Sequence, residues 1–130
     1  MDFWLKEGSF KMPILTIKTN ADQTKFERRF FRDLGENIAM HCGIDARNVM
    51  IVVLGNQSMY FGCSEAICAL ASFVITDDLI NNEQKSKIST DVFKALLAKG
   101  VPSSRTYLTF DRIEKSDIFF NTKRLARPKD

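Results

Sequence analysis

The stretch MPILTIKTN, residues 12–20, is the part of the sequence that indicates the fold. Its β-branched residues predict a strand over residues 14–19, with Pro13 at the first position, where a missing N–H does little harm. The Met12-Pro13 pair reads like a protein start, yet eleven residues precede Met12. The Pro13 nitrogen is therefore a tertiary amide without a basic lone pair. A free proline amine would be a usable base, because its surroundings can lower its pKa towards neutrality.

The residues after this strand predict a helix and a second strand. Thr24 and Glu27 have the spacing of a capping box, which marks the start of a helix. An apolar residue then recurs every four positions, as on one helix face: Phe26, Phe30, Leu34 and Ile38. Gly43 is expected to end the helix. The continuous apolar run 49–54 predicts a strand that is covered on both faces.

The second half of the chain repeats this order. Residues 68–75 predict a strand, and a helix with a periodic apolar face follows Asn81 and ends at Gly100. Residues 106–110 predict the next strand. We therefore expect an α+β fold of two β-α-β repeats, with a four-stranded mixed sheet and two helices on one face. Sister subunits are the expected cover for the other face.

Composition and charge exclude several classes of function. The chain has 130 residues, 45% hydrophobic and 27% charged, and a net charge of +3, which suits one globular domain. Its basic residues form a short cluster at Arg28, Arg29 and Arg32 and a basic tail, without a nucleic-acid reader motif. We find no bilayer-spanning stretch and no signal-peptide core. We expect neither nucleic acid nor membrane as a partner, and a cytoplasmic location, with leaderless secretion left open.

The cysteines and the histidine predict no metal site and no cofactor. Cys42, Cys63 and Cys68 are odd in number and widely spaced, which argues against a disulfide framework. The single histidine, His41, has no familiar zinc-ligand spacing to them. We expect buried or half-buried thiols.

Together these segments resemble the macrophage migration inhibitory factor family of the tautomerase superfamily. The resemblance runs from Met12 to about Leu125, so we expect an N-terminal extension over residues 1–11, the domain over 12–125 and a basic tail over 126–130. It rests on these motifs: Met12-Pro13 before a strand that ends at Thr19-Asn20, VMIV at 49–52, QSMYFGCS at 57–64, Cys68-Ala69, VPSSRTY at 101–107, and Asn121.

The resemblance implies a homotrimer whose active sites lie between subunits. In this family the N-terminal proline is the base for keto–enol tautomerisation of phenylpyruvate-like and dopachrome-like substrates. The resemblance also implies a cytokine-type role with a cell-surface receptor, and secretion without a signal peptide.

The family's site residues carry over only in part. Pro13 matches the catalytic proline and Tyr107 the pocket tyrosine. Ile44 replaces the lysine that grips the substrate carboxylate, and Thr76 replaces a pocket isoleucine. Two further pocket positions also differ, with Thr109 in place of an asparagine and Phe120 in place of a tryptophan.

Each of these residues also fits a purely structural role. Pro13 can simply begin a strand, and Tyr107 can belong to a core or an interface. Ile44 and Phe120 can be packing residues. Thr76 can belong to a turn with Asp77 and Asp78, whose charges would otherwise repel anionic substrates.

Three hypotheses follow. The chain can be a cytokine-like pseudoenzyme with weak or lost tautomerase activity, or an active tautomerase once residues 1–12 are removed. Alternatively, Phe3, Trp4 and Phe10 of the extension can fill the chain's own pocket as an apolar plug.

Overall fold

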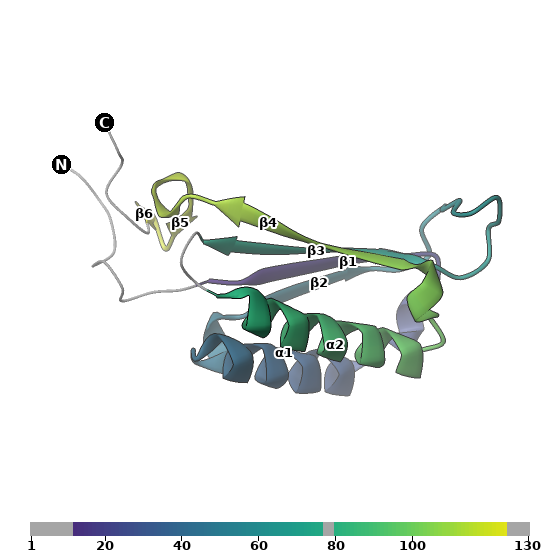
Figure 1. Ribbon diagram of the computed structural model, residues 1–130, viewed down its shortest axis with the longest axis horizontal. Coiled ribbons are helices and arrows are strands. Elements are labelled where there is room, and N and C mark those ends of the chain that lie inside the picture. Colours follow the sequence, from purple (N-terminus) through teal and green to yellow (C-terminus); the bar gives the residue numbers. More distant parts are fainter. Residues whose placement is uncertain (1–11, 77–79, 125–130) are drawn as a thin grey trace.

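The computed structural model describes residues 12–76 and 80–124 and contains a four-stranded mixed sheet with both helices on one face (Figure 1). The strands run in the order β2-β1-β3-β4; β1 is antiparallel to β3, and the pairs β1/β2 and β3/β4 are parallel. This confirms the expected fold class. The elements are β1 (Ile14–Thr19), α1 (Arg28–Cys42), β2 (Met50–Leu54), β3 (Ala69–Thr76), α2 (Asn82–Ala98) and β4 (Thr106–Ile113), followed by the short antiparallel pair β5 (Phe119–Phe120) and β6 (Lys123–Arg124).

The start of α1 differs from the expected capping box. Thr24 lies in a 3-10 turn, Gln23–Lys25, where its backbone N–H donates to the Asp22 carboxylate over 2.8 Å. The helix begins only at Arg28, after Glu27. The predicted capping box is wrong because the N–H and hydroxyl of Thr24 both donate to the Asp22 carboxylate, which holds Thr24 in a separate turn before α1. The helix end was predicted correctly, since Gly43 adopts the left-handed conformation with φ 68°.

A capping box is present at α2 instead. The Asn81 side chain accepts from the backbone N–H of Gln84 over 2.9 Å, and the Gln84 side chain accepts from the backbone N–H of Asn81 over 2.7 Å. Two of the free donors at the helix start are thus satisfied, which fixes where α2 begins.

The core fills the space between the sheet and the helices. Alternate sheet residues such as Leu15, Ile17 and Phe73 point to the helices and are fully buried. Of the apolar stripe predicted for the first helix, Phe30, Leu34 and Ile38 lie on α1 and are buried as expected, whereas Phe26 is buried but precedes the helix. From α2 the core receives Ile88, Val92 and Leu96.

The opposite face of the sheet carries both polar and apolar residues, and several of its large apolar side chains are exposed. Its exposed large side chains are Met50, Val52, Leu54, Leu70 and Tyr107. The expectation that residues 49–54 are covered on both faces is therefore wrong for one chain, because both helices pack on the same face of the sheet. Exposed apolar side chains of this kind are typical of a surface that another subunit covers, which stays a prediction here.

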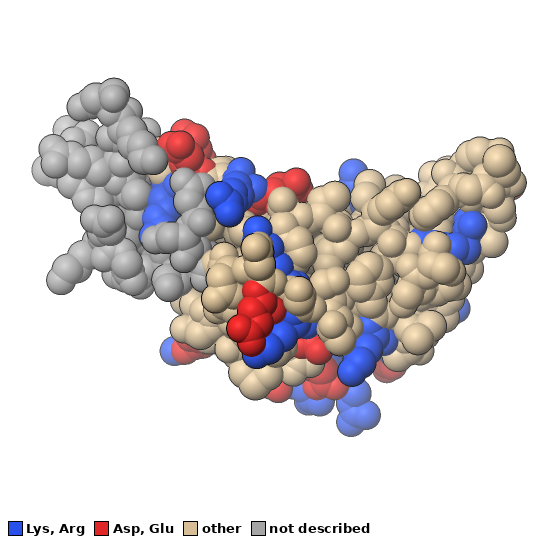
Figure 2. All heavy atoms as spheres, viewed as in Figure 1, with Lys and Arg blue, Asp and Glu red and all other residues tan. Residues whose placement is uncertain are grey.

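The charges and thiols are distributed unevenly. Figure 2 shows charged side chains gathered over the helix layer, whereas the loop end of the molecule, at upper right, is mostly uncharged. Cys42 and Cys68 are buried as expected, but Cys63 is exposed, in a turn where its φ is 61°. Neither helix of the described residues has the length and apolar composition needed to cross a membrane.

Candidate functional site

Pro13 lies at the entrance to the central strand β1. The residue is buried, and its carbonyl oxygen accepts a hydrogen bond from the Met50 N–H over 3.1 Å. That bond belongs to the first pair of the parallel β1–β2 ladder, Ile14 with Met50. Pro13 thus has a structural role in the sheet, in addition to any chemical one, and its nitrogen is an amide within this sequence.

Ile44 lies at the same end of the sheet, where α1 gives way to β2. Its N–H donates to the Ala39 carbonyl over 3.0 Å, and its half-buried side chain packs against the core. Asp45 and Arg47 follow it in an exposed turn. The hydrogen bond from the Arg47 side chain, supported by one from the Arg47 N–H, lowers the pKa of Asp45 to about 2. Asp45 is therefore ionised under ordinary conditions.

Thr76 also lies at the Pro13 end. It is the last residue of β3, two residues beyond Val74, which pairs with Ile14. The side chain is 1% exposed, yet its hydroxyl has no hydrogen-bond partner in the described part of the chain. A buried hydroxyl without a partner destabilises a fold by about 1–3 kcal/mol. Such a group is unusual in a native core and is a candidate for ligand contact.

Phe120 belongs to the β5–β6 pair, which lies near the ends of β3 and β4 in Figure 1. Its side chain is 42% exposed. Asp77 and Asp78, which the sequence places beside Thr76, lie outside the described residues.

Tyr107 and Thr109 come from elsewhere on the sheet. Tyr107 pairs with Leu70, and Leu70 pairs with Lys18 on β1, four residues from Ile14. At the rise of a strand, this separates Tyr107 from the Pro13 end by about 13 Å. Thr109 lies between the two ends, paired with Ser72. One chain therefore does not bring Tyr107 to Pro13, and a pocket with both needs a second chain.

Sequence reasoning missed a cluster around Arg105. Its guanidinium lies 5.2 Å from the centre of the Phe61 ring, and Phe61 stacks on Tyr107 with ring centres 5.2 Å apart. Phe61 and Arg105 are more than forty positions apart in the sequence. Local spacing gives no signal for such a contact, although both residues lie in the quoted motifs.

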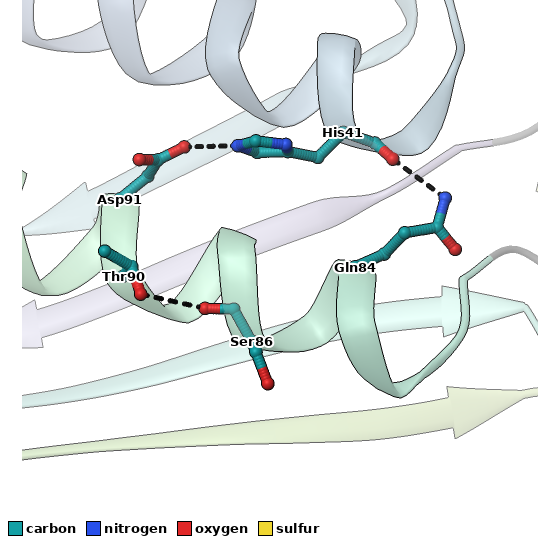
Figure 3. Close-up of polar contacts among 5 residues, drawn as sticks. All are labelled: His41, Gln84, Ser86, Thr90 and Asp91. Atoms are coloured by element: carbon teal, nitrogen blue, oxygen red, sulfur yellow. Dashed lines mark hydrogen bonds and ion pairs between the residues drawn. The ribbon is translucent and has the colours of Figure 1, made fainter.

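A second missed cluster joins the helices (Figure 3). His41 Nε2 lies 2.6 Å from Asp91 Oδ2, and the Gln84 amide donates to the His41 carbonyl over 2.8 Å. Both contacts connect α1 to α2. The cluster lies in the helix layer and not at the Pro13 end, so we assign it a structural role.

The grooves on the helix side do not coincide with the predicted residues. One of about 420 Å³ lies between α1 and the β2 region, and one of about 380 Å³ lies between α1 and α2. Neither is lined by any of the six predicted site residues. Among residues 12–76 and 80–124, no group of three or more His, Cys, Asp or Glu could hold a metal ion.

Two strand–helix–strand units on one mixed sheet, with a proline at the start of the central strand, define a protein of the tautomerase class of fold. A family model described as macrophage migration inhibitory factor matches residues 12–126, and the chain belongs to this family.

Comparisons with individual proteins agree. The chain is 33% identical over 114 residues to a macrophage migration inhibitory factor homolog of Brugia malayi, covering 85% of this chain and 96% of that protein. It is 26% identical over 117 residues to the Xenopus laevis macrophage migration inhibitory factor, covering 88% and 100%. The solved macrophage migration inhibitory factor of Trichinella spiralis has the same fold, with a TM-score of 0.77 at 21% identity over 86% of this chain and 99% of that one.

Proposed function

We propose that this chain is a cytokine-type protein on the tautomerase scaffold, with keto–enol tautomerase activity that is weak or lost. The observation that carries the proposal is the state of Pro13. Its nitrogen is an amide, and its carbonyl is used in pairing with β2. An amide nitrogen cannot accept the proton that enolisation removes from carbon. Without a base at this position, the main chemical step loses its proton acceptor.

The residues around Pro13 support the proposal. Ile44 packs against the core, at the position where the family carries a carboxylate-binding lysine. A charge-assisted hydrogen bond is worth about 1.5–3 kcal/mol, so its absence weakens carboxylate binding by an order of magnitude or more. Asp45, the next residue, is paired with Arg47 over 2.8 Å, so the two together restore no net positive charge at this end. An anionic substrate is therefore disfavoured in binding as well as in chemistry.

A second candidate is an active phenylpyruvate or dopachrome tautomerase that uses Pro13 after removal of residues 1–12. Two observations favour it. The family match begins at Met12, and the chain covers 96% and 100% of the Brugia malayi and Xenopus laevis relatives. Removal would create a secondary amine. Partial desolvation or a nearby cation can lower the pKa of such an amine towards neutrality, which leaves more of it in the basic form.

Enolisation of phenylpyruvate separates the two candidates. The intact chain and a chain that starts at Pro13 are assayed together, with Pro13→Ala in the short chain as the control. We expect the intact chain to stay near the uncatalysed rate. Turnover by the intact chain at the level of ordinary family enzymes would refute the proposal, and intact-mass analysis of natural protein shows which form exists.

Assembly and location are part of the proposal. We propose a homotrimer that covers the sheet face opposite the helices, a cell-surface receptor as partner, a small aromatic keto or enol compound as ligand, and a cytoplasmic location with leaderless secretion. If residues 1–11 act as a plug, their deletion should lower the thermal stability of the chain. Unchanged stability on deletion would exclude the plug.

A further inference from the structure

The loop between β2 and β3 is fixed to the start of β4 by one arginine. The loop, drawn at the right of Figure 1, folds back on itself where the Phe61 and Ser64 backbones exchange hydrogen bonds of 2.9 and 3.2 Å. Arg105 Nη2 donates to the carbonyls of Phe61, Ser64 and Ala66 over 3.0, 3.3 and 3.0 Å, and its Nε donates to Ile67 over 3.1 Å. Because the guanidinium donors have a rigid planar geometry, these bonds fix the loop relative to β4.

This attachment places one aromatic ring against another. The Phe61 ring contacts both the Arg105 guanidinium and the Tyr107 ring, and the two rings are parallel within 1°. Tyr107 is nevertheless 63% exposed. Its ring is therefore held in one orientation while most of its surface is available for contact. A tyrosine held in this way loses little conformational entropy when it binds a partner.

We propose that Phe61 and Arg105 are positioning residues, which hold Tyr107 for contact with a second copy of this chain at the end of the sheet where Pro13 lies. The inference rests on the assembly in the proposed function and deepens it. Tyr107 cannot serve the Pro13 end of its own chain, because the strand register places it near the opposite end of β1.

The uncovered sheet face supports a second copy as the partner. Leu70 and Leu54, which share this face with Tyr107, are 44% and 40% exposed. Lys18 lies near the Tyr107 end of the face, and Asp111, which pairs with Val74, lies near the Pro13 end. A head-to-tail contact between copies would bring these opposite charges towards each other.

The test uses the full chain and measures ring orientation and assembly separately. The sequence has two tyrosines, so Tyr60→Phe leaves Tyr107 as the only site for 3-fluorotyrosine. In this background we compare the 19F resonance of Tyr107 with and without Phe61→Leu or Arg105→Lys. Sedimentation equilibrium of the unlabelled proteins gives the concentration at which the assembly half-dissociates. Tyr60→Phe alone is the control, and Phe61→Tyr tests rescue by a ring that can still stack.

We expect Phe61→Leu to shift the Tyr107 resonance and to raise the half-dissociation concentration on the order of tenfold, the value of a lost aromatic pair. Arg105→Lys should act in the same direction, and Phe61→Tyr should assemble like the parent chain. If Phe61→Leu shifts the Tyr107 resonance but leaves the half-dissociation concentration unchanged, the inference is overturned. A Tyr107 resonance that does not shift in this variant also overturns it. A parent chain that stays monomeric refutes the proposed trimer as well, whereas a stable trimer in every variant refutes only the positioning role.

Discussion

The imidazole of His41 and the carboxylate of Asp91 join α1 to α2 across 2.6 Å, with side chains only 16% and 23% exposed. The two residues are fifty positions apart. This contact connects the helix of the first β-α-β unit to the helix of the second. The sheet joins the same two units separately, through the backbone pairing of β1 with β3. Because the contact between His41 and Asp91 is largely shielded from water, it should matter more than an exposed ion pair.

We expect Asp91→Ala to lower the free energy of unfolding by about 1–2 kcal/mol, since the His41 imidazole is left without its partner. Asp91→Asn, which can still hydrogen-bond, should cost less. The matched control is Lys87→Ala, because the Lys87–Glu83 pair on α2 is exposed and should contribute under about 0.5 kcal/mol. Urea unfolding at one fixed protein concentration measures all three. Equal effects of Asp91→Ala and Lys87→Ala would contradict the assigned role.

Gly55 should not tolerate a side chain. A Cβ at this position would lie 2.7 Å from Gln23 Cα, and the Gly55 N–H donates to the Gln23 side chain over 2.6 Å. Gly55→Ala must push these two backbone segments apart, at a cost of about 1–3 kcal/mol. Gly35→Ala on α1 is the control. Its Cβ would meet only the Ile51 side chain at 3.7 Å, and alanine should stabilise the helix by about 1 kcal/mol. Thermal unfolding should therefore show shifts of opposite sign.

The low pKa of Asp45 should depend on Arg47. In the folded chain the pKa of Asp45 is lowered from 3.8 to about 2 by hydrogen bonds from the Arg47 side chain and N–H. A lowered pKa means that the ionised Asp45 carboxylate stabilises the folded chain. This contribution is complete above pH 3.8 and is lost as the pH falls through about 2, where the carboxylate is protonated. Arg47→Gln should raise the Asp45 pKa towards 3.8, read from its carboxyl 13C shift between pH 1.5 and 6. Arg28→Gln, on α1, should leave it unchanged.

Much of the fold was predictable because its signals are local. The strand over residues 14–19, the stop at Gly43 and the buried faces of both helices follow from periodicity and glycine geometry, and the structure confirms them. The Thr24 capping box does not form because Asp22 is a competing local acceptor. The prediction for the apolar run at 49–54 was wrong for one chain. Such a run indicates a strand with two apolar faces, but it does not show whether the same chain or another subunit covers the second face.

The candidate site was less accessible to sequence reasoning. The resemblance placed Pro13, Ile44 and Thr76 by position, and the structure brings them to one end of the sheet. It could not show that Tyr107 lies near the other end, since this depends on strand register. The contacts of Arg105 with Phe61, and of His41 with Asp91, depend on tertiary packing between distant segments, for which a single sequence carries no spacing signal.

Thr76 offers the sharpest test of whether the Pro13 end has been kept for binding at a cost in stability. Its hydroxyl is buried and has no partner among the described residues, so replacing it with a methyl group of the same shape removes a desolvation cost and no hydrogen bond. Thr76→Val should raise the free energy of unfolding by about 1 kcal/mol, and Thr76→Ser, which keeps the hydroxyl but loses a methyl group, should lower it. Urea unfolding measures both changes, provided that the dependence of the unfolding free energy on urea concentration is the same in each variant. If Thr76→Val destabilises the chain, the hydroxyl has a structural partner, and its candidacy for ligand contact ends. If it stabilises, the threonine is kept against the stability of the fold, which is expected of a residue retained for what it binds.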